Sequence, residues 1–156
     1  MLIFLYRRDK HFAYKKQRRL KVSIYFWSDD FNTMSNPKTI ADFLAGKSSV
    51  TQSLFHHFVN EYNKLGVVTL CPAKTMIGID NGRKRIGWIT QLGKNFVHVV
   101  FPFKQPYNDN LCFQKIAQVP GTPRQYNHHF RMYNAEDINE EVIRFMKLAM
   151  EEEVAG

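Results

Sequence analysis

The sequence predicts an α+β fold, a two-layer sandwich in which an antiparallel sheet of about five strands carries the N-terminal and C-terminal helices on one face. Three observations predict it. Apolar residues recur every three or four positions between residues 37 and 66 and again after residue 137, as in amphipathic helices. From residue 67 to residue 133 the period is two, and β-branched and aromatic residues are frequent. Short turn sequences separate the strands, which favours antiparallel pairing.

Two helices are expected before the sheet. The first is short, with Asn36 as its N-cap, Pro37 at the first helical position and Gly46 at its stop. The second is longer and amphipathic. Either serine of the Ser48-Ser49 pair supplies its cap, and Gly66 ends it.

Five strands are expected in the central region, at residues 67–70, 74–79, 83–91, 96–103 and 125–133. The Asn81-Gly82 pair joins the second strand to the third, because both residues tolerate a positive φ. Residues 104–123 are expected to be a crossover loop. Within it, residues 111–119 are apolar-periodic and are compatible with either a short helix or a short strand.

A closing helix is expected to begin at Asn134 or at Asp137. Glu140 lies three residues after Asp137, which is the spacing of a capping box. Residues 151–153 are all glutamate, and negative charge is unfavourable at a helix C-terminus. The last turn is therefore expected to fray.

The chain has two unlike parts, although its 156 residues suit a single domain. Residues 1–33 carry eight Lys or Arg and three Asp, a balance of +5, so residues 34–156 carry the remaining +3 of the total +8. Residues 34–156 are expected to form one domain, with residues 1–33 as a basic N-terminal extension outside it. Two interpretations of the extension stay open, a basic arm for nucleic acid or an anionic surface, and an upstream stretch before a natural start at Met34.

Cellular location is inferred from the apolar runs and the cysteines. No apolar run reaches the roughly 20 residues that span a bilayer, so no membrane partner is expected. The apolar residues 1–6 precede Arg7 and Arg8, the reverse of the order in a secretory signal. Cys71 and Cys112 lack metal or disulfide spacing and are expected to be buried free thiols in the cytoplasm.

Five short motifs are spread over residues 40–150. They are Phe43-Leu44-Ala45-Gly46-Lys47, Lys74-Thr75-x-Ile77, Arg83-x-Arg85, Arg124-x-x-x-His128-His129-x-Arg131 and Asp137-Ile138-Asn139-x-Glu141. In this order and spacing they resemble DUF5655, a bacterial and archaeal domain of unknown function. The resemblance implies an α+β domain that occurs alone or fused to other modules. It implies no established activity, cofactor or catalytic residue.

Sequence signatures of enzymes and metal sites are absent from the chain. It contains no glycine-rich phosphate loop, no G-x-S-x-G, no H-E-x-x-H and no zinc-type spacing. His56 and His57 diverge on a helix, and His128 and His129 point to opposite faces of a strand, so neither pair can hold one ion. A binding module with no cofactor and no metal is therefore expected rather than an enzyme.

Charge segregation indicates where such a module would bind. Residues 74–131 hold nine basic and two acidic residues, whereas residues 132–156 hold two basic and seven acidic ones. Lys and Arg contact phosphates, and aromatic rings stack on unpaired bases. The open sheet face is therefore expected to bind nucleic acid or another anionic partner through Arg83, Arg85, Trp88, Arg124, His129 and Arg131. The alternative is a solvated face whose charge serves solubility.

Two other function classes stay open. One is a small enzyme or small-ligand receptor with a pocket between sheet and helix that contains Cys71, His98 and His128. The other is a protein–protein interaction domain that self-associates through its sheet. His98 is also expected to lie near one of the two adjacent histidines and Arg131, where the group would bind an anion or relay protons. The structural alternative for each histidine is a half-buried, hydrogen-bonded side chain.

Overall fold

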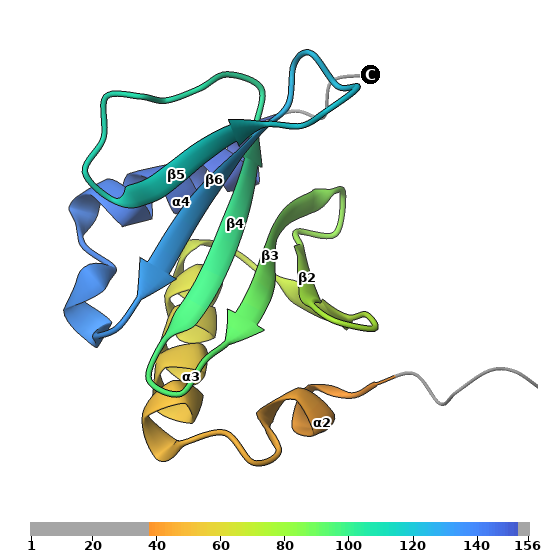
Figure 1. Ribbon diagram of the computed structural model, residues 1–156, viewed down its shortest axis with the longest axis vertical. Helices are drawn as coiled ribbons and strands as arrows, with labels where there is room; N and C mark the ends of the chain where they lie inside the picture. The colour runs from red at the N-terminus through yellow and green to blue at the C-terminus, as the bar shows by residue number, and fades with distance from the viewer. Residues whose placement is uncertain (1–37, 153–156) are drawn as a thin grey trace, which may run out of the picture. The chain divides into compact units, whose positions relative to one another are not determined.

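An open antiparallel sheet of six strands is the main element of the computed structural model, which describes residues 38–152 (Figure 1). The strands lie in the order β1-β2-β3-β4-β6-β5. The elements are α2 (Ile40–Leu44), α3 (Ser49–Leu65), β1 (Thr69–Pro72), β2 (Ile77–Asp80), β3 (Arg85–Leu92), β4 (Val97–Phe103), β5 (Phe113–Gln118), β6 (Tyr126–Met132), the short 3-10 helix η1 (Ala135–Asp137) and α4 (Glu140–Glu151). The predicted α+β class is confirmed, and the sheet has one strand more than expected.

The helices α3 and α4 lie behind the sheet in Figure 1 and cover one of its faces. Alternate residues of β4, from Val97 to Phe103, are buried on that face. The ring of Phe101 meets that of Tyr62 in α3, with centroids 6.5 Å apart, and the ring of Phe103 meets that of Phe145 in α4 at 5.9 Å. This aromatic contact between two helices and the central strand forms the core and fixes which sheet face points inward.

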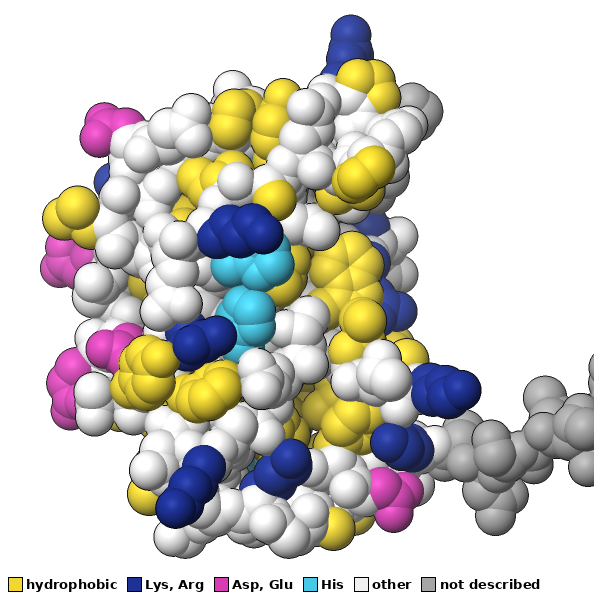
Figure 2. Space-filling model, viewed as in Figure 1, with side chains coloured by type: hydrophobic (Ala, Val, Ile, Leu, Met, Phe, Trp, Pro, Cys, Tyr) yellow, Lys and Arg dark blue, Asp and Glu magenta, His cyan; other side chains and the backbone are white. Residues whose placement is uncertain are grey.

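The other sheet face is not covered by any described element, and we call it the open face (Figures 1 and 2). Its side chains come from the strand residues that alternate with those buried in the core. Across the β4–β6 pair, His98 is opposite Arg131 and Val100 is opposite His129. Histidine side chains are visible at the centre of this face in Figure 2, with Lys and Arg side chains above and below them.

The first described helix starts later than expected. The predicted cap and first position, Asn36 and Pro37, lie outside the described residues, and α2 begins at Ile40. Thr39 is its N-cap, because its hydroxyl accepts a hydrogen bond from the Asp42 backbone N–H at 3.2 Å. The Asp42 carboxylate accepts in return from the Thr39 N–H at 2.7 Å. This reciprocal pair of hydrogen bonds is a capping box, and its cap, Thr39, comes three residues after the predicted cap, Asn36.

The predicted boundaries of the first strands were wrong by two or three residues. Val67 is 84% exposed and precedes β1, and the turn between β1 and β2 includes Lys74. The third strand begins at Arg85 because the Asn81 side chain holds the preceding turn. Its amide oxygen accepts hydrogen bonds from the backbone N–H groups of residues 83 and 84, at 3.0 and 2.9 Å, so these groups are not available to a strand.

The expected crossover loop at residues 104–123 contains the sixth strand, β5, at the edge of the sheet. It pairs antiparallel with β6, and the register shifts between Phe113 and Lys115. The shift interrupts the period of two, so Phe113 and Ile116 both lie opposite core-facing residues of β6 although they are three positions apart. That spacing explains why the sequence fits a helix and a strand equally well.

The closing helix α4 begins at Glu140, and Asn139 is its N-cap, with the side-chain oxygen 3.0 Å from the Val142 backbone nitrogen. The predicted capping box of Asp137 with Glu140 was therefore wrong. The Asp137 carboxylate instead accepts from the backbone N–H groups of Tyr133 and Asn134, at 2.6 and 2.9 Å, and holds the turn that leaves β6.

Residues 38–152 belong to one structural unit. The predicted extension, residues 1–33, lies outside the described residues. Within residues 38–152, no helix has the length and apolar character needed to cross a membrane.

Candidate nucleic-acid interface

A pocket of about 310 Å³ opens at one end of the sheet and brings together three of the predicted binding residues. Arg85 and Trp88 come from β3, and Arg124 comes from the loop between β5 and β6. Lys84 and Lys104 also line it. The pocket therefore combines an aromatic ring with four cationic side chains, and we call it the Trp88 pocket. Glu152, at the end of α4, is its one acidic lining residue among those described.

The sheet register explains how Trp88 is presented. Trp88 lies opposite Gly78 on β2 and Val100 on β4. A side chain at residue 78 would collide with Arg85, because a Cβ there would lie 1.0 Å from the arginine Nη1 atom. The Arg85 guanidinium group thus lies over the glycine, on the same face as the tryptophan. The glycine leaves room for that side chain, and a larger residue here would require the Arg85 guanidinium group to move.

Arg85 is held by a two-point ion pair with Asp80. The distances are 2.6 Å from Nε to Oδ1 and 3.2 Å from Nη2 to Oδ2. Each side chain is about one third exposed, so solvent weakens the pair, but the two contacts fix the plane of the guanidinium group. Asp80 keeps the cation at the rim of the pocket and does not bury it.

Cys71 shares the Asp80 carboxylate, with Sγ 3.1 Å from Oδ2. That hydrogen bond raises the pKa of the Cys71 thiol, and burial and the negative charge of Asp80 act in the same direction. The thiol is only partly buried, because β1 is an edge strand; the expectation of a buried thiol was wrong. A protonated thiol beside a carboxylate is a poor nucleophile.

Arg83 does not line the Trp88 pocket. Its side chain lines a separate hollow of about 470 Å³ beside the β2–β3 turn, which it shares with Asp80 and Arg85. All three consecutive basic residues 83–85 line this hollow, and Lys84 and Arg85 line the Trp88 pocket as well.

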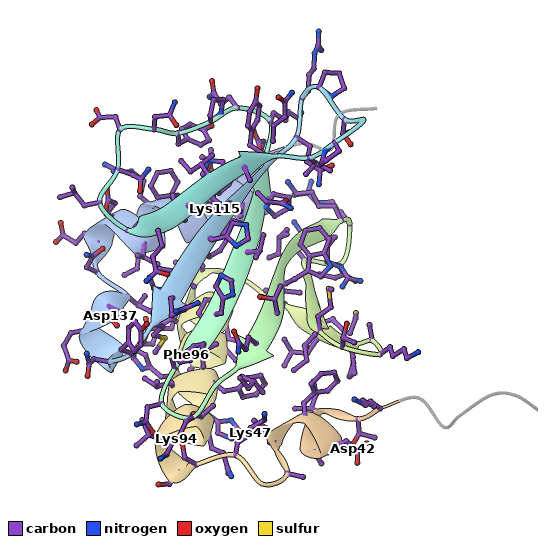
Figure 3. All side chains as sticks on the ribbon, in the orientation of Figure 1. Asp42, Lys47, Lys94, Phe96, Lys115 and Asp137 are labelled. Carbon is purple, nitrogen blue, oxygen red and sulfur yellow. The ribbon has the colours of Figure 1, made fainter. Side chains whose placement is uncertain are left out.

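His98 and His129 form a second feature of the open face. The rings are stacked with centroids 5.3 Å apart and planes 27° apart, and Nε2 of His98 lies 3.2 Å from Nδ1 of His129. Burial lowers the pKa of both imidazoles, and the charge of Lys115 lowers that of His129 further. His129 and Arg131 additionally lower the pKa of His98. Figure 3 shows Lys115 beside this part of the sheet.

Arg131 lies over an aromatic ring on the same face. Its guanidinium carbon lies 4.6 Å from the centroid of Phe96, and Nη1 lies 3.3 Å from the Tyr133 hydroxyl oxygen. The Nε–H group is buried and has no hydrogen-bond acceptor among the described residues. Arg131 therefore has a fixed orientation and an unused donor.

His128 lies on the opposite face, fully buried against the helices. Its Nδ1–H donates to the Tyr126 carbonyl oxygen at 3.1 Å, and Nε2 accepts from the Tyr107 backbone N–H at 3.1 Å. These two contacts specify a neutral ring, and burial lowers its pKa. Cys71 and His98 lie on the open face, so the structure does not bring the three residues of the expected catalytic pocket together.

The sequence reasoning did not single out Lys84, Lys104 and Lys115. Lys84 is adjacent to two predicted residues and lies in the turn before β3, so no strand pattern could have placed it. The other two lie in the segment expected to be a crossover loop, where the register shift hid the strand. Among the described residues, no three His, Cys, Asp or Glu side chains lie where they could hold a metal ion.

No protein-family model, curated protein or solved structure matches this chain. The resemblance to DUF5655 therefore stays a prediction. The fold and the site define a class in geometric terms, an open-faced α+β sandwich with cationic and aromatic side chains on its uncovered face.

Proposed function

We propose that this protein binds single-stranded nucleic acid on its open face, with a base stacked on Trp88 and phosphates contacted by the surrounding cations. The observation that carries the proposal is the Trp88 pocket, in which Arg85, Lys104 and Arg124 surround one aromatic ring. Single-strand sites combine these two elements, because every base has a stacking face and every nucleotide carries a phosphate.

The distribution of charge on this face supports an anionic partner. Figure 2 shows Lys and Arg side chains across the face and Asp and Glu side chains toward its edges. A strand that crosses from the pocket toward Arg131 would pass Lys115 and the two stacked histidines. Each phosphate that a cation neutralises contributes about −0.7 to the slope of log K against log salt for single strands.

The form of the pocket favours a single strand over a duplex. A duplex stacks its bases on each other, so their faces cannot reach a tryptophan in a sheet. In an unpaired strand the bases are free to stack, and one base on an aromatic side chain contributes about 1–3 kcal/mol. The Arg85 guanidinium group lies over Gly78, opposite Trp88, so a cation and the aromatic ring are side by side on this face.

The experiment is a fluorescence-anisotropy titration of a labelled oligodeoxythymidine with the full chain, repeated over a series of salt concentrations. Trp88→Ala is expected to raise Kd by about 5- to 150-fold, the equivalent of the stacking energy. Trp88→Phe should restore part of the loss. Arg124→Ala should reduce the salt slope by about 0.7, the contribution of one phosphate contact.

Arg144→Ala is the matched control. Arg144 is a well-exposed residue of α4, the helix that covers the opposite face of the sheet. Its Nη2 atom lies 3.8 Å from Oε1 of Glu141. The Arg144→Ala substitution removes the same charge as Arg124→Ala and should leave Kd and the salt slope unchanged. The basic residues 1–33 are present in every variant, so their contribution cancels. If Trp88→Ala and Arg124→Ala bind as well as Arg144→Ala, the open face is not the binding site.

A further inference from the structure

The geometry of the stacked pair of His98 and His129 determines which ring nitrogens carry a proton. A nitrogen–nitrogen contact of 3.2 Å requires one N–H donor and one lone pair. The other ring nitrogen of His98, Nδ1, lies 3.1 Å from the Thr90 hydroxyl oxygen. The hydroxyl can accept or donate, so the chain from Thr90 through His98 to His129 has two tautomeric forms, both neutral.

One added proton converts both forms to the same species. In that species the hydrogen bond between the two rings is kept, and Nδ1 of His98 and Nε2 of His129 are both N–H donors. A second proton would place two N–H groups against each other at 3.2 Å and break the contact. The pair is therefore built to accept one proton and not two.

The surroundings of the pair disfavour that proton until an anion is present. The register neighbours of His98 are Gln91 on β3 and Arg131 on β6. Those of His129 are Val100 on β4 and Lys115 on β5. Two cations and no carboxylate therefore flank the pair in the described sheet, and Arg131 also contacts the Tyr133 hydroxyl.

The same surroundings are suited to an oxyanion. Lys115 and Arg131 contribute fixed positive charge on the two sides, and the buried Nε–H of Arg131 has no acceptor among the described residues. Protonation of the pair adds a third positive charge and a further N–H donor. Charge-assisted hydrogen bonds of this kind are the stronger ones.

We infer that His98 and His129, between Lys115 and Arg131, form a second anion site that binds one phosphate group and takes up one proton as it does so. This inference rests on the proposed function, because the phosphate belongs to the bound strand. The second anion site lies apart from the Trp88 pocket. Coupling is reciprocal: the anion raises the pKa of the pair, and the proton raises affinity for the anion by the same factor.

The first test uses the unaltered full chain and sulfate, whose charge does not change between about pH 5 and pH 8. The imidazole signals of the histidines are followed by NMR as a function of pH, with sulfate or with chloride at equal ionic strength. Sulfate is expected to raise the apparent pKa of His98 and His129 together, by about one unit, and to leave exposed His56 unshifted. No shift of the pair, or an equal shift at all histidines, would overturn the site.

The second test measures oligodeoxythymidine binding at about pH 8 and about pH 5.5. Affinity is expected to be about five- to tenfold higher at the lower pH, because a pKa rise of about one unit on binding corresponds to at most about a tenfold gain in affinity. His98→Gln or His129→Gln should each abolish this gain, and the double variant should lose no more than either single one, because the two rings share one proton. His56→Gln, on α3, should keep the gain.

The outcomes separate this inference from the proposed function. At about pH 8 the pair is neutral, so binding that depends on Trp88 and Arg124 tests the proposed function alone. Strand binding that is equal at both pH values, or losses from the two single variants that add, overturns the shared-proton site and leaves the proposed function standing. A sulfate-dependent shift of the pair without strand binding at either pH shows a site for a free oxyanion and overturns the proposed function.

Discussion

Replacing Thr51 with valine is expected to destabilise the fold at the point where α3 holds the β3–β4 hairpin. Thr51 is fully buried, and its hydroxyl lies 2.7 Å from the Gly93 carbonyl oxygen and 2.9 Å from that of Lys94. It also accepts a hydrogen bond from the Ser48 hydroxyl at 3.0 Å. Valine has the same shape, so Thr51→Val removes one donated and one accepted hydrogen bond without a cavity. At about 1 kcal/mol net for each bond, the free energy of unfolding should fall by about 1–2 kcal/mol.

Urea denaturation followed by circular dichroism measures this change. With a slope of about 1–2 kcal/mol per molar for a chain of this size, the midpoint should fall by about 0.5–2 M. Ser53→Ala is the control, since Ser53 is exposed on the same helix and the change removes a hydroxyl without a buried partner. An unchanged or higher midpoint for Thr51→Val would refute the view that this hydroxyl anchors the hairpin.

Three further predictions concern a tyrosine hydroxyl, three histidines and two thiols. Tyr62→Phe should raise the free energy of unfolding by about 1 kcal/mol in the same urea assay, because the Tyr62 hydroxyl is buried with no partner among the described residues; a loss of stability would contradict this. In phosphate-free and sulfate-free buffer, stability should fall as pH drops below 6.5. The histidines of β4 and β6 have a lowered pKa when folded, so the unfolded chain binds more protons there, at up to about 1.4 kcal/mol per pH unit for each group; a flat profile between pH 6.5 and 5 would exclude it. The pKa of Cys71 is raised and that of Cys112 is raised to about 12, so both thiols should react with iodoacetamide at neutral pH more slowly than in urea, and equal rates would show that neither is protected.

Local sequence signals identified the elements that local hydrogen bonds determine. Ser48 caps α3 and Gly66 ends it, as expected, because cap and stop depend on neighbours within a few residues. The start of β3 was missed because the Asn81 side chain occupies two backbone N–H groups that a strand would use. The strand β5 was missed because the register shift between Phe113 and Lys115 removes the period of two.

The candidate site depends on contacts between distant segments, which a single sequence does not determine. Strand alternation shows that His128 and His129 face opposite ways, but the register between β4 and β6 decides that His129 joins His98. Arg124 reaches the Trp88 pocket because the β5–β6 loop lies near the start of β3. Arg83 was grouped with Arg85 by proximity in sequence; it shares a hollow with Arg85 but does not line the Trp88 pocket.

Photo-crosslinking of a 4-thiothymidine oligonucleotide to the full chain, followed by peptide mapping, tests the proposed open-face binding most directly. The expected result is a crosslinked peptide that contains Trp88, with a second crosslink in the loop that carries Arg124. Trp88→Ala should remove the first crosslink, and Arg144→Ala should leave both in place. Crosslinks confined to residues 1–37 or to α4 would contradict binding on the open face.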